Sequence, residues 1–174
     1  TGGSTASKRS ALLRDVLILH FHTVQPPDRV GVVRKLRLGG TIQRANPGCL
    51  PAKYDLDLTA PNAHKTAAWT GPSKTSISKL INPWIHKYIF LTELIASSSN
   101  GKPYLFHPYN DVSRPLSPSQ WTATVKACFA RHAGISVSPK TLRASFITFL
   151  KGRTDAPEVL MSAAHAMRHQ KKTQ

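Results

Sequence analysis

The sequence predicts one α+β domain that is mainly helical and carries a small antiparallel sheet. Three observations lead to this class. The long apolar-periodic segments have the length and the end signals of helices. Short segments with alternating apolar and polar residues gather between residues 41 and 78, where they predict strands. The 174 residues, 40% of them hydrophobic, suffice for a single domain with its own core.

The first predicted helix covers residues 7–23, which combine a polar start with a solid apolar stripe. The opening TGGSTAS (residues 1–7) reads as a flexible lead-in, so the predicted domain covers residues 8–174. A proline pair then interrupts the chain. A short helix follows from about Asp28 to Arg37 and ends before Gly39-Gly40.

Three strands are predicted next. TIQR (41–44) and YDLDLTA (54–60) show period-2 alternation, and KTSIS (74–78) supplies a third short strand. The connection between the last two, PNAHKTAAWTGPS, is rich in turn residues and carries Lys65.

The rest of the chain is predicted to be helical. Helical spacing returns in NPWIHKYIFLTELIASSS (82–99), and residues 117–134 open with Ser-Pro and end in Gly. A further helix covers residues 138–150, and a last one runs from residue 155 to the end of the chain. No internal repeat is present.

The charge balance predicts a polyanionic partner. The chain has 24 Lys and Arg against 8 Asp and Glu, a formal charge of +16. Repulsion among so many positive side chains destabilises the folded state unless a polyanion lies nearby, and nucleic acid is the leading candidate. An anionic membrane fits less well, because the cations are spread along the chain and not gathered on one amphipathic segment.

Cysteine use and hydropathy favour an intracellular protein. Cys49 and Cys128 form no disulfide framework, which suits a reducing compartment. We find no signal peptide, and apolar runs such as VLIL (16–19) are too short to cross a bilayer.

The few carboxylates argue against metal-dependent chemistry. Only Asp55 and Asp57 lie close together, and they alternate with apolar residues as the outer face of a strand would. Two-metal nucleases need several converging carboxylates. We therefore expect no metal site and no cofactor, and any chemistry on phosphodiesters is expected to use cations.

The helix at 138–150 poses a question. Lys140 and Arg143 fall on its first turn, where the positive end of the helix dipole favours acidic residues. A bound anion would explain two cations at this position.

Four basic positions occur in order along the chain: Arg29, Lys65, the pair Lys140 and Arg143, and His169. Each alone has an ordinary surface interpretation. Their order and spacing together resemble the catalytic domain of tyrosine recombinases, over about residues 10–174.

Several motifs carry this resemblance. KTLRASFIT follows the family's second arginine block, with Lys140 at the usual histidine position. DRVGVVRKLRL is similar to the first block but has Val32 where an acid is usual. HKTAAWTGPSKTSIS and AAHAMRHQKKTQ look like segments of crypton-like and retrotransposon recombinases. The resemblance implies a three-stranded antiparallel sheet packed on a helical bundle.

The resemblance also implies roles. Arg29 and Arg143 would bind the non-bridging phosphate oxygens, and Lys65 would be the general acid for the leaving 5′ oxygen. Lys140 and His169 would position the phosphate, with His165 as an alternative that otherwise faces the core. The expected contacts with the backbone of duplex DNA are Arg34, Lys35, Arg37, Arg44, Lys74, Lys79, Lys126 and Arg131.

One departure concerns the nucleophile. All tyrosines, at 54, 88, 104 and 109, precede the second arginine block, whereas the family's nucleophilic tyrosine would fall just past Gln174. Either the sequence stops before the nucleophile or this is a domesticated, non-cleaving relative. In both cases this chain is expected to bind DNA without cleaving it.

The predicted function is therefore DNA strand exchange through a 3′-phosphotyrosine intermediate, in the nucleus. The full-length protein would act as a synaptic tetramer, and this chain would be a monomer. Three alternatives stay open: a non-catalytic DNA-binding module of the same fold, an unrelated basic nucleic-acid-binding protein, and a metal-dependent nuclease using Asp55, Asp57 and Lys65. The target DNA sequence is not predictable from these residues.

Overall fold

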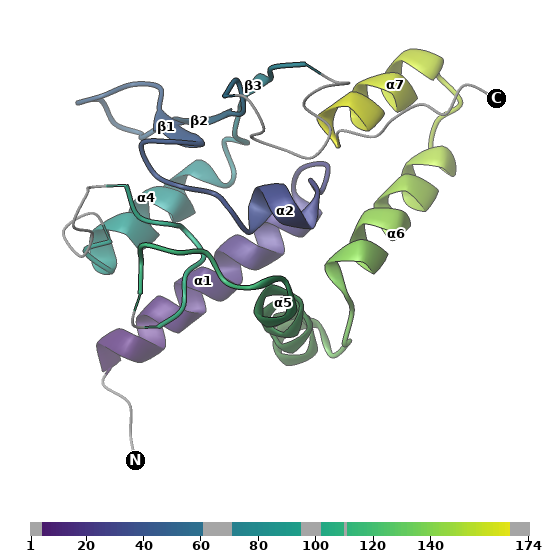
Figure 1. Cartoon of the computed structure of the whole chain (residues 1–174). Helices are drawn as coiled ribbons and strands as arrows, with labels where there is room; N and C mark the ends of the chain where they lie inside the picture. Colours follow the sequence, from purple (N-terminus) through teal and green to yellow (C-terminus); the bar gives the residue numbers. More distant parts are fainter. Residues whose placement is uncertain (1–4, 61–70, 95–101, 110, 168–174) are drawn as a thin grey trace.

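A computed structural model of the chain describes residues 5–60, 71–94, 102–109 and 111–167 (Figure 1). These residues form six helices and one three-stranded antiparallel sheet, which confirms the predicted α+β class. The elements in chain order are α1 (Thr5–Thr23), α2 (Val30–Val33), β1 (Ile42–Arg44), β2 (Tyr54–Asp57), β3 (Lys74–Ser76), α4 (Asn82–Leu91), α5 (Pro118–Ala133), α6 (Pro139–Lys151) and α7 (Pro157–Ala166).

The sheet has the order β1-β2-β3 and confirms all three predicted strands. Its register pairs Ile42 with Leu56 and Asp55 with Ser76. In β2 the burial alternates: Tyr54 and Leu56 are buried, while the two aspartates between and after them are partly exposed. Period-2 alternation therefore predicted both the strand and its inner face.

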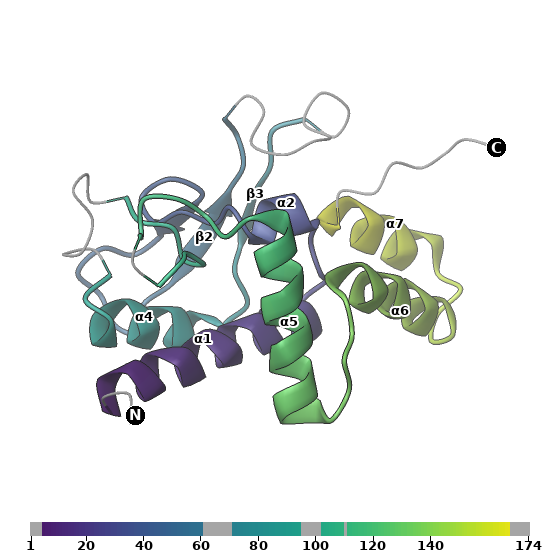
Figure 2. The same ribbon diagram turned by 60° about the horizontal axis from the view of Figure 1, so that its bottom comes forward.

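Helix α1 forms the centre of the helical part and packs against α4 and α5 (Figure 2). Its buried residues include Leu17, Ile18 and Phe21. Trp121 of α5 is fully buried, with its ring centroid 4.7 Å from that of Phe106. These side chains belong to the same hydrophobic core as the inner residues of the sheet.

Asn82, at the start of α4, forms hydrogen bonds with the sheet and the segment that follows it. Its side chain accepts a hydrogen bond from the Tyr54 N–H at 3.1 Å and donates to the Ile77 carbonyl at 3.3 Å. Asn82 is buried, so these bonds satisfy polar groups that water cannot reach. Burial also raises the pKa of Tyr54, whose hydroxyl lies 3.3 Å from Nδ1 of His86.

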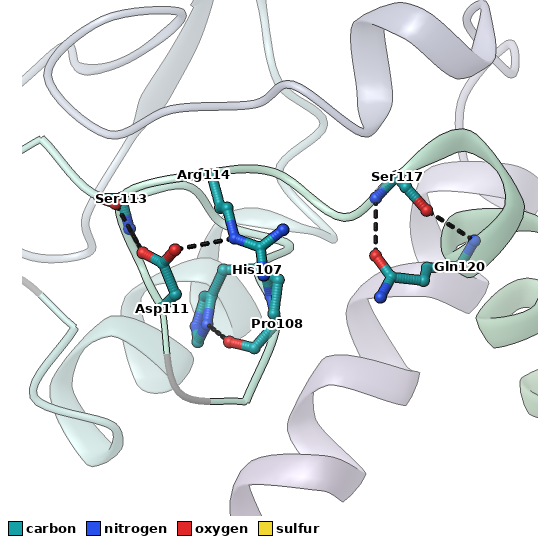
Figure 3. A network of polar contacts seen from close by, with 7 residues as sticks. All are labelled: His107, Pro108, Asp111, Ser113, Arg114, Ser117 and Gln120. Carbon is teal, nitrogen blue, oxygen red and sulfur yellow. Dashed lines mark hydrogen bonds and ion pairs between the residues drawn. The ribbon is translucent and has the colours of Figure 1, made fainter.

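Helix α5 has the end signals that its sequence predicted. Ser117 and Gln120 form a reciprocal capping box at the start of α5 (Figure 3). Gly134 ends the helix in the left-handed conformation at φ 70°. The predicted boundaries of this helix are confirmed.

The loop before α5 is ordered by local polar contacts, also shown in Figure 3. The Asp111 carboxylate accepts hydrogen bonds from the backbone N–H and hydroxyl of Ser113 and from Nε of Arg114. The bonds from Ser113 lower the pKa of Asp111. His107 Nδ1 lies 2.7 Å from the Pro108 carbonyl, and burial lowers the pKa of His107.

Two helices are shorter than predicted. The helix expected from Asp28 to Arg37 is the single turn α2, because the chain after it pairs with a distant segment. Leu38 donates to the Pro103 carbonyl at 3.0 Å, and Leu105 donates to the Leu36 carbonyl at 2.8 Å. Helix α4 ends at Leu91, well before the predicted residue 99.

Helix α6 matches its predicted boundaries, whereas α7 ends at Ala166 and the remainder of its predicted range, 168–174, lies outside the described residues. The two helices contribute little to the core: within their bounds, Pro139 is the one described residue that is buried. In the described part of the chain, no helix has the length and apolarity needed to cross a membrane.

Candidate phosphodiester-binding site

Arg29 occupies a fixed position at the start of α2. Its backbone N–H donates to Oδ1 of Asp28 at 2.6 Å, and its carbonyl accepts from the N–H groups of Val32 and Val33 at 2.8 and 3.1 Å. Both valines are buried and anchor the turn. The sequence therefore places a half-buried arginine directly after the proline turn that ends α1.

Arg143 is half-buried on α6 and connects that helix to the end of α7. Its Nη2 donates to the backbone carbonyl of Met167 at 2.5 Å. Met167 is buried and caps α7. Arg143 thus positions the segment that immediately precedes His169 in the sequence.

A small cavity of about 130 Å³ lies near these two positions, although neither Arg29 nor Arg143 is among its described lining residues. Gln25, Pro26 and Asp28 line it from the turn before α2, and Ala166 lines it from the end of α7. The sheet contributes the remaining wall, made of Leu56, Thr75, Ser76 and Ile77. These segments, from the turn before α2, from β3 and from the end of α7, lie close together in Figure 2.

The wall of this cavity therefore includes the neighbour of Arg29 and the neighbour of Met167, which Arg143 contacts. Asp28 and Ala166, 138 residues apart in sequence, meet there. Among the described residues that line the cavity, Asp28 alone is acidic, and its carboxylate already accepts the N–H of Arg29.

Lys140 lies on the first turn of α6 and is exposed. Ser138 caps this helix by accepting a hydrogen bond from the Thr141 N–H at 3.1 Å, and the first turn contains no acidic residue. The positive helix end and Lys140 therefore add to one another, as an anion site requires.

Two of the predicted basic positions are outside the part of the chain that the structure describes. Lys65 and His169 lie outside the described residues. Lys65 belongs to the connection between β2 and β3, where the hairpin continues through a 2.8 Å hydrogen bond from Leu58 N–H to the Ser73 carbonyl. His165, the alternative to His169, is exposed on α7, so the interpretation of His165 as core-facing is wrong.

Five of the eight predicted DNA contacts are engaged with protein groups: Arg34, Arg37, Arg44, Lys74 and Arg131. The first three donate to backbone carbonyls at 2.5, 2.6 and 2.7 Å. Lys74 lies 3.7 Å from Asp55, and Arg131 is ion-paired with Asp15. Lys35, Lys79 and Lys126 are exposed, and their side chains make no hydrogen bond or ion pair with the described residues.

Comparison with known proteins assigns no family: neither a protein-family model nor a curated protein matches this chain.

The aspartates of β2 are engaged within the sheet. Asp55 accepts a hydrogen bond from the Ser76 hydroxyl, and Asp57 accepts from both the N–H and the hydroxyl of Thr59. The bonds from Thr59 lower the pKa of Asp57.

Sequence reasoning missed two features of this region. It did not anticipate that the hydroxyl residues Thr75 and Ser76 would line the cavity, although their strand was predicted. It also missed the hydrogen bond from Arg143 to the Met167 carbonyl, because residue identity does not show which backbone carbonyl will accept a hydrogen bond.

Proposed function

We propose that this chain is the catalytic domain of a DNA strand-exchange protein of the tyrosine-recombinase type, working on duplex DNA in the nucleus. The observation that supports this most is the cavity at which the Asp28-Arg29 turn, β3 and the end of α7 meet. A recombinase needs these segments close together, because Arg29, Lys65 of the β2–β3 connection and His169 beyond α7 would all act on one phosphate.

In this proposal Arg29 and Arg143 stabilise the negative charge that builds on the non-bridging oxygens during phosphoryl transfer. Planar guanidinium groups suit this role, because they stay charged and can donate two parallel hydrogen bonds. Lys140 adds positive charge from the start of α6. Lys65 is proposed as the general acid and His169 as a phosphate-positioning group.

The surface charge favours a polyanionic substrate independently of the cavity. Eight carboxylates can neutralise at most a third of the 24 Lys and Arg side chains. Five of the six described helices also lack an acidic residue in their first turn. Duplex DNA supplies the missing negative charge along an extended surface.

A double-mutant cycle tests whether Arg29 and Arg143 act on one phosphate. We expect R29A and R143A each to weaken binding to a short DNA duplex by about 10-fold or more, since hydrogen bonds to charged groups contribute about 1.5–3 kcal/mol. The double variant should lose clearly less than the product of the two single effects, because both side chains serve the same group. Fluorescence anisotropy at fixed salt measures all four affinities.

The matched control is K126A, which removes an exposed lysine of α5. Any loss of affinity in K126A should come from its own separate phosphate contact, so its effect should combine independently with that of R143A. Independent effects of R29A and R143A would mean that the two arginines contact separate phosphates, and the proposed site would be abandoned. If a longer form of the protein supplies a tyrosine after Gln174, that form should become covalently linked to a nicked duplex, and R143A should abolish the adduct.

A non-catalytic DNA-binding module on the same fold is the second candidate. Val32 favours it, because the residue at the position of the family's usual acid is buried in the core with 4% of its surface exposed. Tyr54 and Tyr88 are also buried, and burial raises the pKa of both. This candidate predicts DNA binding with no adduct from any longer form.

A further inference from the structure

Three side chains with metal-binding chemistry meet between α1 and α5, beside Arg131, which is ion-paired with one of them. They are Asp15 of α1 and Cys128 and His132 of α5. One carboxylate oxygen, the thiol sulfur and one imidazole nitrogen all lie within 4.8 Å of one another. Asp15 is 113 residues from Cys128, so residue spacing alone does not reveal this cluster.

The local structure holds the donors in place. Cys128 and His132 are four residues apart on α5, so both project from the same face of the helix. The Cys128 thiol donates to the Asp15 backbone carbonyl at 3.6 Å, and His132 Nε2 lies 2.9 Å from Oδ2 of Asp15. The Asp15 side chain is 4% exposed and that of His132 is 29% exposed. The cluster is therefore closed on the core side and open to solvent at His132.

We propose that Asp15, Cys128 and His132 bind one zinc-like divalent cation that joins α1 to α5. Sulfur, nitrogen and carboxylate oxygen are the donors that Zn²⁺ takes, at about 2.0–2.3 Å in a tetrahedral arrangement. Because the three donor atoms already lie within 4.8 Å of one another, small side-chain movements suffice to bring them to the ion. A water molecule entering beside His132 would complete the coordination.

The charges balance on binding. The Cys128 thiol loses its proton to solvent, and the thiolate and the Asp15 carboxylate together neutralise the divalent ion. His132 turns its Nε2 from Asp15 to the metal and stays neutral. No oxidant, reductant or other reactant takes part.

Arg131 competes with the ion. Its guanidinium is ion-paired with Oδ2 of Asp15, and its side chain is 56% exposed. Removing this cation frees the carboxylate for the metal and removes a repulsive charge beside it. R131A is therefore expected to bind the metal several-fold more tightly than the unaltered chain, an effect that a purely structural ion-pair cluster would not show.

Cobalt titration tests the proposal, because Co²⁺ reports its ligands by absorption. The chelator-treated chain should bind one equivalent of Co²⁺, with a thiolate-to-cobalt charge-transfer band and the visible bands of tetrahedral cobalt. C128S should lose the charge-transfer band, and H132Q should weaken binding at least tenfold. C49S is the matched control: Cys49 is exposed and distant in sequence, so the spectrum should be unchanged.

Two results would overturn the site: no charge-transfer band at stoichiometric cobalt, or a band that persists in C128S and disappears in C49S. Circular dichroism of each variant verifies the fold. R131A keeps all three ligands and leaves the buried thiol intact, so it tests the site even if C128S does not fold. DNA binding plays no part in this experiment, so its outcome is separate from that of the proposed recombinase function.

Discussion

The hydrogen bond from Arg143 to Met167 predicts how the C-terminal helices are held. Helices α6 and α7 are covered by few neighbours, and Phe149, Val159 and Met161 are 58%, 43% and 55% exposed. With so little apolar burial, the docking of α7 depends strongly on this one charged donor. R143A should therefore loosen α7 while leaving the rest of the domain folded.

The size of the expected destabilisation of α7 follows from the type of hydrogen bond that is lost. A hydrogen bond from a charged donor contributes about 1.5–3 kcal/mol. Because about 1.4 kcal/mol corresponds to a factor of ten, local opening of α7 should become about 10- to 150-fold more frequent. Amide protons of α7 from Glu158 onward should exchange faster by that factor, whereas those of α1 should not change.

Hydrogen–deuterium exchange with peptide resolution measures this effect. K140A is the matched control, because Lys140 is exposed on the same helix and its side chain makes no hydrogen bond or ion pair with a described residue. Equal exchange of α7 in R143A and in the unaltered chain would refute the reasoning, and α7 would then be held by its apolar contacts alone. Accelerated exchange throughout the chain would equally contradict it, because Arg143 would then support the whole core.

Three further predictions concern charge and helix ends. His22 is buried, and burial lowers its pKa below the ordinary 6.5, so the folded state disfavours the protonated imidazole. The free energy of unfolding should therefore be largest above pH 6.5 and fall as the pH decreases. In thermal melts, H22Q should show a smaller fall in Tm between about pH 7.5 and 5.5 than the unaltered chain. S117A removes the capping box of α5 and should cost about 1 kcal/mol, a decrease of about 2–4 °C in Tm by calorimetry; an unchanged Tm would show that Pro118 and packing suffice. K126A should reduce the slope of log affinity for duplex DNA against log salt by about one if Lys126 contacts a phosphate, and an unchanged slope would place this lysine outside the DNA interface.

The elements that the sequence predicted well are those with local determinants. Residues 54–57 alternate strictly, and Ser117 and Gly134 mark both ends of α5, so the predicted strand and helix are confirmed. The region after Arg29 shows the opposite case. Its helical pattern extends to Arg37, yet the structure ends α2 at Val33 because Leu36 and Leu38 pair with residues 103–105. Such pairing over more than 60 residues has no local signature.

The candidate site shows the same limit. Residue types and their order were enough to single out Arg29, Lys140 and Arg143. They could not reveal that Arg34 and Arg37 donate to backbone carbonyls of distant loops, because an arginine looks the same in sequence whether it binds phosphate or protein. The prediction for duplex DNA accordingly rests most directly on exposed lysines such as Lys126.

The buried indole of Trp121 gives the molecule an internal optical probe. It stands on α5 against Phe106 and has its ring centroid 5.9 Å from that of His22 on α1. Its Nε1 is shielded from water and lacks a hydrogen-bond partner among the described residues. Separation of α1 from α5 would expose this indole and shift its emission to longer wavelength, so fluorescence can follow the joining of these two helices without any added label.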